Sequence, residues 1–116
     1  MLHVLLLDLK DDPAGIAEYE RWHAAGAVPA AVTASIRRAG IEDMRIFRAG
    51  NRLVMLMETG AAYDPAAKAA GDAADPDVQA WETLMDRFQQ AIPAAVPGTK
   101  WTEAGQIFAL HEQEGA

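Results

Sequence analysis

Cysteine is absent from this 116-residue chain, and that absence removes several classes of chemistry at once. Without thiols the chain can form neither disulfides nor thiolate zinc sites, and it cannot use a catalytic cysteine. Basic residues are also few, with 10 lysines and arginines against 17 aspartates and glutamates and a net charge of -7. Because nucleic-acid affinity comes largely from basic side chains on phosphates, we expect no nucleic-acid partner, and an anionic membrane surface is equally disfavoured.

A long apolar run is missing as well. No stretch approaches the roughly 20 apolar residues that a membrane-spanning helix requires. The N-terminal sequence MLHVLLLDLKDD lacks the basic start, the longer apolar region and the small-residue cleavage site of a signal peptide, so we expect a cytoplasmic protein. With 51% hydrophobic residues, the chain (1–116) is long enough for one domain with a substantial core and too short for two.

Short apolar runs bounded by turn residues predict the strands. They lie at 3–9, on both sides of the turn Ala49-Gly50-Asn51 within 44–59, and at 101–110, where Gly105 indicates a bulge or a close backbone approach. The two 44–59 runs form a β-hairpin.

Two aspartate–proline steps predict the starts of the main helices, because aspartate caps a helix and proline suits its first position. The first helix begins at Asp12-Pro13, is interrupted at Gly26 and restarts at Pro29. The second spans 75–93 and ends at a proline. Residues 60–76 between them are alanine-rich and contain two glycines and two prolines, which indicates a loop with at most a short helix around 65–70.

The order strand, helix, strand, strand, helix, strand predicts an α+β fold of the ferredoxin-like split βαββαβ type, an antiparallel sheet with helices on one face. The other face also needs cover. Residues 4–7 leave neither face of the first strand polar, and residues 53–57 make the third strand apolar on both faces. Since the helices supply only one layer, we expect a homodimer in which a second copy packs sheet against sheet.

The segment YERWH, residues 19–23, gathers hydrogen-bonding and titrating side chains in a chain otherwise rich in alanine and aliphatic residues. Tyr19 and His23 are four residues apart, so on a helix they lie one turn apart on the same face. A histidine beside a tyrosine can transfer protons near neutral pH, because its unperturbed pKa is about 6.5. Spacing alone favours packing roles for both residues, with Tyr19 at the edge of the core. The small residues of AGAVP, which follow directly, leave room for a small ligand.

For each of the other candidate residues, a structural role has to be weighed against a functional one. Trp81 belongs to the apolar stripe of the second long helix, and its flat ring is also a surface of the kind on which sugar rings pack. His3 and His111 lack the spacing of metal ligands, so we expect no metal site. Glu58 ends a strand, where a solvated carboxylate is more common than a catalytic base. Phosphate-binding glycine loops and G-x-S-x-G nucleophile motifs are absent from the sequence.

Five segments follow one another along the chain: YERWH, VPAAV…IRRAGIEDMRIF, NRLVMLMET, DPDVQAWETLMDRFQ and WTEAGQIFAL. Their most specific features are Y-x-x-x-H on the first helix, a proline six residues after that histidine, W-x-x-x-M, and the closing I-F-x-L. Each feature is weak alone. In order and spacing together, the segments resemble the L-rhamnose mutarotase family over residues 3–110.

The resemblance implies a homodimeric, ferredoxin-like α+β barrel, in agreement with the dimer expected above. It also implies an enzyme that interconverts the α and β anomers of a deoxyhexose such as L-rhamnose, by acid–base chemistry and without a metal or an organic cofactor. The family's proton-donating histidine matches His23, and its tyrosine one turn earlier matches Tyr19. On this basis we expect His23 to be catalytic and Tyr19 and Trp81 to bind the sugar.

Two departures from the family pattern concern the sugar. Met44 stands where some members have a second pocket tyrosine, and Glu82 follows Trp81 where they have two consecutive tryptophans, so the substrate need not be rhamnose. Two alternatives from other classes stay open. A cofactor-independent monooxygenase of the same barrel type would suit the methionine-rich third strand (Met55 and Met57), and a non-catalytic binder of small ligands would keep the scaffold without the chemistry.

Overall fold

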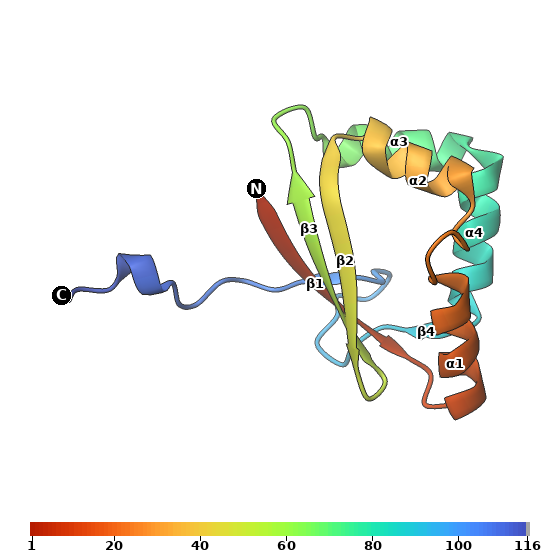
Figure 1. The fold of residues 1–116 in the computed structure, drawn as a ribbon, viewed down its shortest axis with the longest axis horizontal. Coiled ribbons are helices and arrows are strands. Elements are labelled where there is room, and N and C mark those ends of the chain that lie inside the picture. The colour runs from red at the N-terminus through yellow and green to blue at the C-terminus, as the bar shows by residue number, and fades with distance from the viewer. Residues whose placement is uncertain (116) are drawn as a thin grey trace.

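Figure 1 shows a sheet with its long helices on one side and an extended C-terminal segment on the other. The structure is a computed structural model that describes residues 1–115. Its long strands are β1 (Leu2–Leu9), β2 (Ile41–Ala49) and β3 (Arg52–Thr59), and its short ones are β4 (Gln89–Gln90) and β5 (Thr102–Glu103). The helices are α1 (Pro13–Trp22), α2 (Ala30–Arg38), α3 (Pro65–Ala74) and α4 (Pro76–Asp86), followed after β5 by a 3₁₀-helix, η1 (Leu110–Glu112).

The sheet is antiparallel at every strand pair, with the strand order β2-β3-β1-β4. The remaining strand, β5, pairs with β1 opposite Leu5 and Leu6, on the same side of β1 as β4. With two helical regions crossing one face, this is the strand order of the split βαββαβ arrangement. The prediction of an α+β, ferredoxin-like fold with an antiparallel sheet is therefore confirmed.

Burial alternates along β3, because the helices cover one face of the sheet only. Leu53, Met55 and Met57 are buried on the helix side, whereas Val54 and Leu56 between them are half-buried. Within residues 1–115, no helix lies over the second face (Figure 1). We call this second face of the sheet, which is apolar as expected, the open face.

Two adjoining clusters of buried side chains form the core between the sheet and the helices. The first contains Leu9, Tyr19, Leu53, Met85 and Phe88, and the second contains Ile41, Met55 and Met57. Trp101 packs against both clusters, so the segment before β5 joins them.

Three helices begin in the same way, with an aspartate that caps the helix and a proline directly after it. Asp12, Asp64 and Asp75 each accept a hydrogen bond from the backbone N–H two residues further on. Each bond satisfies one of the N–H groups that lack a partner at a helix start. None of the helices within residues 1–115 is long and apolar enough to cross a membrane.

The structure corrects three predicted boundaries. Residues 65–74 form a full helix, α3, instead of a loop with at most a short helix, because Asp64 caps this alanine-rich segment. The helix predicted to run to Pro93 ends at Asp86, where the Phe88 carbonyl accepts a hydrogen bond from Lys10 N–H at 2.8 Å and draws the chain onto β1. Strand β2 begins at Ile41, three residues before the predicted start.

The predicted final strand at 101–110 differs most from the structure. Only Thr102 and Glu103 form a strand, and Ala104 N–H makes one further bond to the Val4 carbonyl, at 2.7 Å. Beyond this bond the chain leaves β1 and runs away from the sheet on the side opposite the helices (Figure 1). Gly105 has open space around it, so the predicted close approach is wrong. The segment does contain apolar side chains as the pattern predicted, but Ile107, Phe108 and Leu110 are exposed and do not pack against the chain's own sheet.

Candidate active site

A cavity of about 700 Å³ lies between the sheet and the helices, which is within the usual range for small-molecule sites. Its sheet wall is largely apolar, with Leu5 and Met55 in the lining, and most of its polar groups come from the helices and loops. Tyr19, His23 and Trp81 all line this one cavity. The structure therefore brings together the three residues that the sequence singled out.

The end of α1 places His23 at the cavity. His23 is the residue directly after the last turn of the helix, and its Nδ1 lies 2.7 Å from the backbone carbonyl oxygen of Tyr19. The last carbonyls of a helix lack an intrahelical partner, so the imidazole satisfies one of them. A carbonyl can only accept, so Nδ1 carries the hydrogen, and the neutral ring keeps Nε2 as a free acceptor.

Aromatic rings surround the imidazole on two sides. The centroid of the His23 ring lies 4.2 Å from that of Tyr19 and 5.3 Å from that of Trp81, which it meets edge-on at 64°. Trp81, on α4, also packs against the first core cluster and meets Trp22 at 6.3 Å. His23 is thus held between two helices, with its orientation set by packing as well as by the hydrogen bond.

Burial sets the protonation states at this end of the cavity. It lowers the pKa of His23 below its usual 6.5, and the hydrogen bond to the Tyr19 carbonyl opposes this only in part. Burial also raises the pKa of Tyr19 above its usual 10.0, against the effect of the Gln89 hydrogen bond. The Gln89 amide donates to the Tyr19 hydroxyl at 3.3 Å, so the phenolic hydrogen stays available. Near neutral pH the site therefore holds a neutral imidazole beside a neutral phenol.

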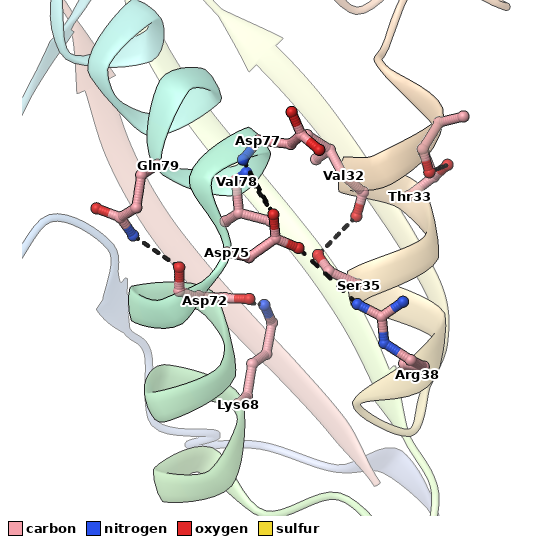
Figure 2. Close-up of polar contacts among 11 residues, drawn as sticks. Val32, Thr33, Ser35, Arg38, Lys68, Asp72, Asp75, Asp77, Val78 and Gln79 are labelled. Atoms are coloured by element: carbon pink, nitrogen blue, oxygen red, sulfur yellow. Dashed lines mark hydrogen bonds and ion pairs between the residues drawn. The ribbon is translucent and has the colours of Figure 1, made fainter.

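A second polar group, which the sequence analysis missed, lies on α3 and just before it. Figure 2 shows Lys68 and Asp72 on successive turns of α3, close to the start of α4. Their side chains form an ion pair and are 19% and 18% exposed, and both line the cavity. Tyr63 lines it too, and burial raises the pKa of its phenol, with smaller effects from nearby carboxylates such as Asp72.

The sequence contained a signal for this second group. Asp64-Pro65 has the same capping pattern as the two helix starts that were predicted, and it makes residues 65–74 a helix. On a helix, Lys68 and Asp72 are one turn apart and form a typical ion pair.

Met44 and Glu82, the two departures from the family pattern, both line the cavity. Met44 lies opposite Met57 in the sheet and packs against the second core cluster. Tyr63 packs against the same cluster and lines the same cavity, so the cavity contains a second tyrosine ring that comes from a different part of the chain.

His3 and Glu58 lie outside the lining of the cavity. The His3 ring bridges Glu103 on β5, at 3.1 Å, and the hydroxyl of Thr59 on β3, at 3.2 Å, and so ties these strands to β1. Glu58 lies 3.6 Å from the N-terminal amino group. Among residues 1–115 there is no group of three histidine, aspartate or glutamate side chains placed to hold a metal ion.

Comparisons with known proteins agree on one family. The family profile described as L-rhamnose mutarotase matches residues 3–110. An L-fucose mutarotase from Xanthomonas campestris pv. campestris is 62% identical over 107 residues, which cover 92% of this chain and 86% of that protein. The crystal structure of an L-rhamnose mutarotase from Formosa agariphila has a TM-score of 0.66 at 16% identity, covering 95% of this chain and 98% of that one. At that identity, the structural match supports the fold alone.

Proposed function

Because the chain belongs to the L-rhamnose mutarotase family, we propose that it interconverts the α and β anomers of a deoxyhexose and that this sugar is L-fucose. The observation that carries the reaction is His23, a neutral imidazole with a free Nε2 in a cavity of suitable size. L-Fucose is favoured because the highly identical relative from Xanthomonas is named for it. L-Rhamnose is the second candidate, and the family profile favours it.

The proton path follows from the free Nε2. This atom takes the proton from the anomeric hydroxyl, O1, and passes it to the ring oxygen, O5. The C1–O5 bond breaks as the C1=O1 carbonyl forms, which opens the ring with one hydroxyl at C5. Rotation about C1–C2 presents the other face of the carbonyl, and the same proton transfers in reverse close the ring to the second anomer. One histidine can act as both base and acid because O1 and O5 lie on one edge of the sugar.

The remaining cavity residues bind the sugar in this proposal. Tyr19 donates its free phenolic hydrogen to the sugar near the reacting edge. Trp81 offers its ring to the apolar C–H face of the sugar. The hydroxyls on the far edge reach the polar group of Tyr63, Lys68 and Asp72. The C6 methyl group, which distinguishes a deoxyhexose from a hexose, suits the methionines of the sheet wall.

The reaction as written needs neither a metal nor an organic cofactor. Each proton moves between the sugar and His23, and no electrons are transferred. We expect activity to survive exhaustive treatment with EDTA. Loss of activity that one divalent ion restores would contradict this mechanism.

A homodimer is part of the same proposal. The open face of the sheet carries exposed apolar side chains, among them Leu2 and Phe47, each 51% exposed. A second copy facing this sheet would bury them. We expect sedimentation at micromolar concentration to show a dimer, and a stable monomer would contradict the proposal.

Exchange spectroscopy by NMR tests both the reaction and the sugar. Saturating the H1 signal of one anomer should transfer saturation to the other at a rate that rises with protein concentration. D-Fucose is the matched control, because enantiomers exchange at identical rates in water and only a chiral site separates them. We expect the order L-fucose, then L-rhamnose, then D-fucose at the uncatalysed rate.

The outcomes separate the parts of the proposal. Faster exchange of L-rhamnose would overturn L-fucose as the substrate and leave the reaction standing. Protein-independent exchange of every sugar would overturn the reaction and favour the binder or the monooxygenase. Family membership already favours sugar chemistry over the monooxygenase.

A further inference from the structure

Gln89 is a polar residue of the cavity lining that has no role of its own in the proposed reaction. It is the first residue of β4 and lies opposite Leu9 of β1. Cross-strand partners share one face of a sheet, and Leu9 belongs to the first core cluster, so the Gln89 side chain lies on the helix side. The next residue, Gln90, points to the other face and is exposed. The short strand β4 thus presents one amide to the cavity.

The ring of Tyr19, which this amide contacts, is held in place by packing. The centroid of the Phe88 ring lies 6.0 Å from that of Tyr19, and the two rings meet edge-on at 67°. The His23 ring packs against Tyr19 from another side, and Tyr19 is buried. Phe88 is itself fixed, because its carbonyl accepts the hydrogen bond from Lys10 N–H. The hydroxyl hydrogen is therefore the one part of the Tyr19 side chain that stays free to rotate.

The Gln89 amide determines where that hydrogen points. The structure places the amide nitrogen of Gln89, and not the amide oxygen, 3.3 Å from the Tyr19 hydroxyl. An amide nitrogen only donates, so the phenolic oxygen accepts and its hydrogen turns away from Gln89. Within residues 1–115 the Tyr19 hydroxyl makes no other hydrogen bond. The phenolic hydrogen is left for a group in the cavity that both residues line.

We propose that Gln89 is a positioning residue, whose amide turns the phenolic hydrogen of Tyr19 toward the sugar and keeps this hydroxyl a hydrogen-bond donor. The inference rests on the proposed function, in which Tyr19 donates to the sugar near the reacting edge. A donor that already points at its target needs no reorganisation when the sugar binds. The group that Tyr19 meets is accordingly an acceptor oxygen of the sugar.

Gln89→Glu tests the direction of this bond with a very small change of shape. A carboxylate only accepts, so it would take the phenolic hydrogen that the sugar needs. At saturating L-fucose, we expect catalysed exchange to fall as far as in Tyr19→Phe, by up to about tenfold. Gln90→Glu makes the same change at the next, exposed position outside the cavity lining, and should exchange at the wild-type rate. Wild-type exchange by Gln89→Glu overturns the proposal.

A double variant separates the lost hydrogen from the added charge. Tyr19→Phe has no phenolic hydrogen, so Gln89→Glu in that background has nothing left to redirect. We expect the double variant to match Tyr19→Phe within about twofold, because both substitutions remove the same interaction. The rates are compared at the plateau of each pH profile, where His23 is neutral in every variant. Losses that multiply would show that Gln89 acts apart from Tyr19, which also overturns the proposal.

A measurement without sugar separates this inference from the proposed reaction. The Gln89 hydrogen bond lowers the pKa of Tyr19, against the larger effect of burial. Gln89→Met removes the amide and keeps an unbranched side chain, so it should raise the pKa of Tyr19, measured by NMR of isotope-labelled tyrosine rings. Tyr63, the other of the two tyrosines, is the internal control and should keep its pKa.

The two kinds of measurement give distinct failures. An unchanged Tyr19 pKa in Gln89→Met would show that the amide does not donate to the phenol, and it overturns the proposal whatever the sugar results. A raised Tyr19 pKa in a protein whose wild type exchanges no deoxyhexose would show that the bond exists and that the proposed function, with the role of the bond in it, is wrong.

Discussion

Two helices each present a pair of side chains four residues apart to the same cavity, and the two pairs differ in chemistry. At the end of α1, Tyr19 and His23 are aromatic and neutral, and burial keeps them so. On α3, Lys68 and Asp72 carry opposite charges and neutralise each other. The same helical spacing thus produces a neutral aromatic pair in one place and an ion pair in the other, and only the first is proposed to transfer protons.

Because their chemistry differs, we expect the two pairs to have different roles within one site. A neutral imidazole with a lowered pKa can accept and return a proton near pH 7, which the proposed reaction needs. A half-buried ion pair supplies strong hydrogen-bond donors and acceptors in fixed positions, which suits recognition of sugar hydroxyls. Substitutions at the first pair should therefore change the rate of exchange, and substitutions at the second should change the affinity for the sugar.

Apart from replacement of His23 itself, the largest expected effect is that of pH on the α1 pair. In the proposed mechanism proton transfer needs neutral His23, whose pKa is lowered from 6.5 by burial. Catalysed exchange should be constant through pH 7 and fall about tenfold per pH unit once the pH drops below that pKa, because the protonated ring has lost its acceptor at Nε2. The measurement is the exchange rate against pH, with the uncatalysed rate subtracted. A catalysed rate that rises toward acid would contradict a neutral base.

Trp81→Ala should lower both stability and sugar affinity. Because Trp81 is half-buried and packs against the first core cluster, we expect a loss near the lower end of the roughly 3–5 kcal/mol typical for a buried tryptophan. Trp22→Ala is the matched control, since Trp22 is 36% exposed and lies outside the cavity lining. Denaturant unfolding and sugar titration would measure the two effects. If Trp81→Ala is as stable as wild type, its place in the core is wrong.

Lys68→Met should weaken sugar binding and leave the maximal rate unchanged. A hydrogen bond to a charged group contributes about 1.5–3 kcal/mol, so we expect the KM to rise by roughly tenfold or more. Arg38→Met removes another ion-paired cation close by, from the pair with Asp75 outside this cavity, and should leave the KM as it is. If Lys68→Met lowered kcat at an unchanged KM, the assignment of sugar binding to the α3 pair and of proton transfer to the α1 pair would be wrong.

Tyr19→Phe should have the smallest effect of these variants. It removes only the hydroxyl that accepts from Gln89 and leaves the backbone carbonyl that orients His23. A single hydrogen bond contributes about 1 kcal/mol, so we expect the exchange rate to fall by less than about tenfold. The measurement is the same NMR exchange experiment at saturating sugar. A loss as large as that caused by replacing His23 would make Tyr19 the main proton carrier.

The α1 pair could be predicted from the sequence because its signals are local. Asp12-Pro13 marks the start of the helix, the four-residue spacing puts Tyr19 and His23 on one face, and the order of segments resembles a family with this pair. The α3 pair was missed for the opposite reason. Alanine-rich residues 65–74 have no stripe of large apolar side chains, so only the Asp64 cap indicated a helix.

The segment that follows β5, residues 105–115, shows a different limit of sequence reasoning. Residues 105–110 have the apolar pattern of a strand, and a local pattern does not say which chain supplies the neighbouring strand. Within residues 1–115, this segment makes no backbone hydrogen bond to another strand beyond Ala104. The prediction of a strand over 101–110 is therefore wrong beyond Thr102 and Glu103.

Exchange by a His23 variant tests the central claim most directly. His23→Gln cannot carry a proton between O1 and O5, although its amide can still donate to the Tyr19 carbonyl and keep the end of α1 in place; His23→Ala removes both functions. At saturating L-fucose and neutral pH, both variants should fold and assemble like wild type. A single general acid or base contributes about 10²–10⁴-fold, so exchange should fall by that factor to near the uncatalysed rate. Exchange by folded His23→Gln at the wild-type rate would contradict the claim that this histidine carries the proton.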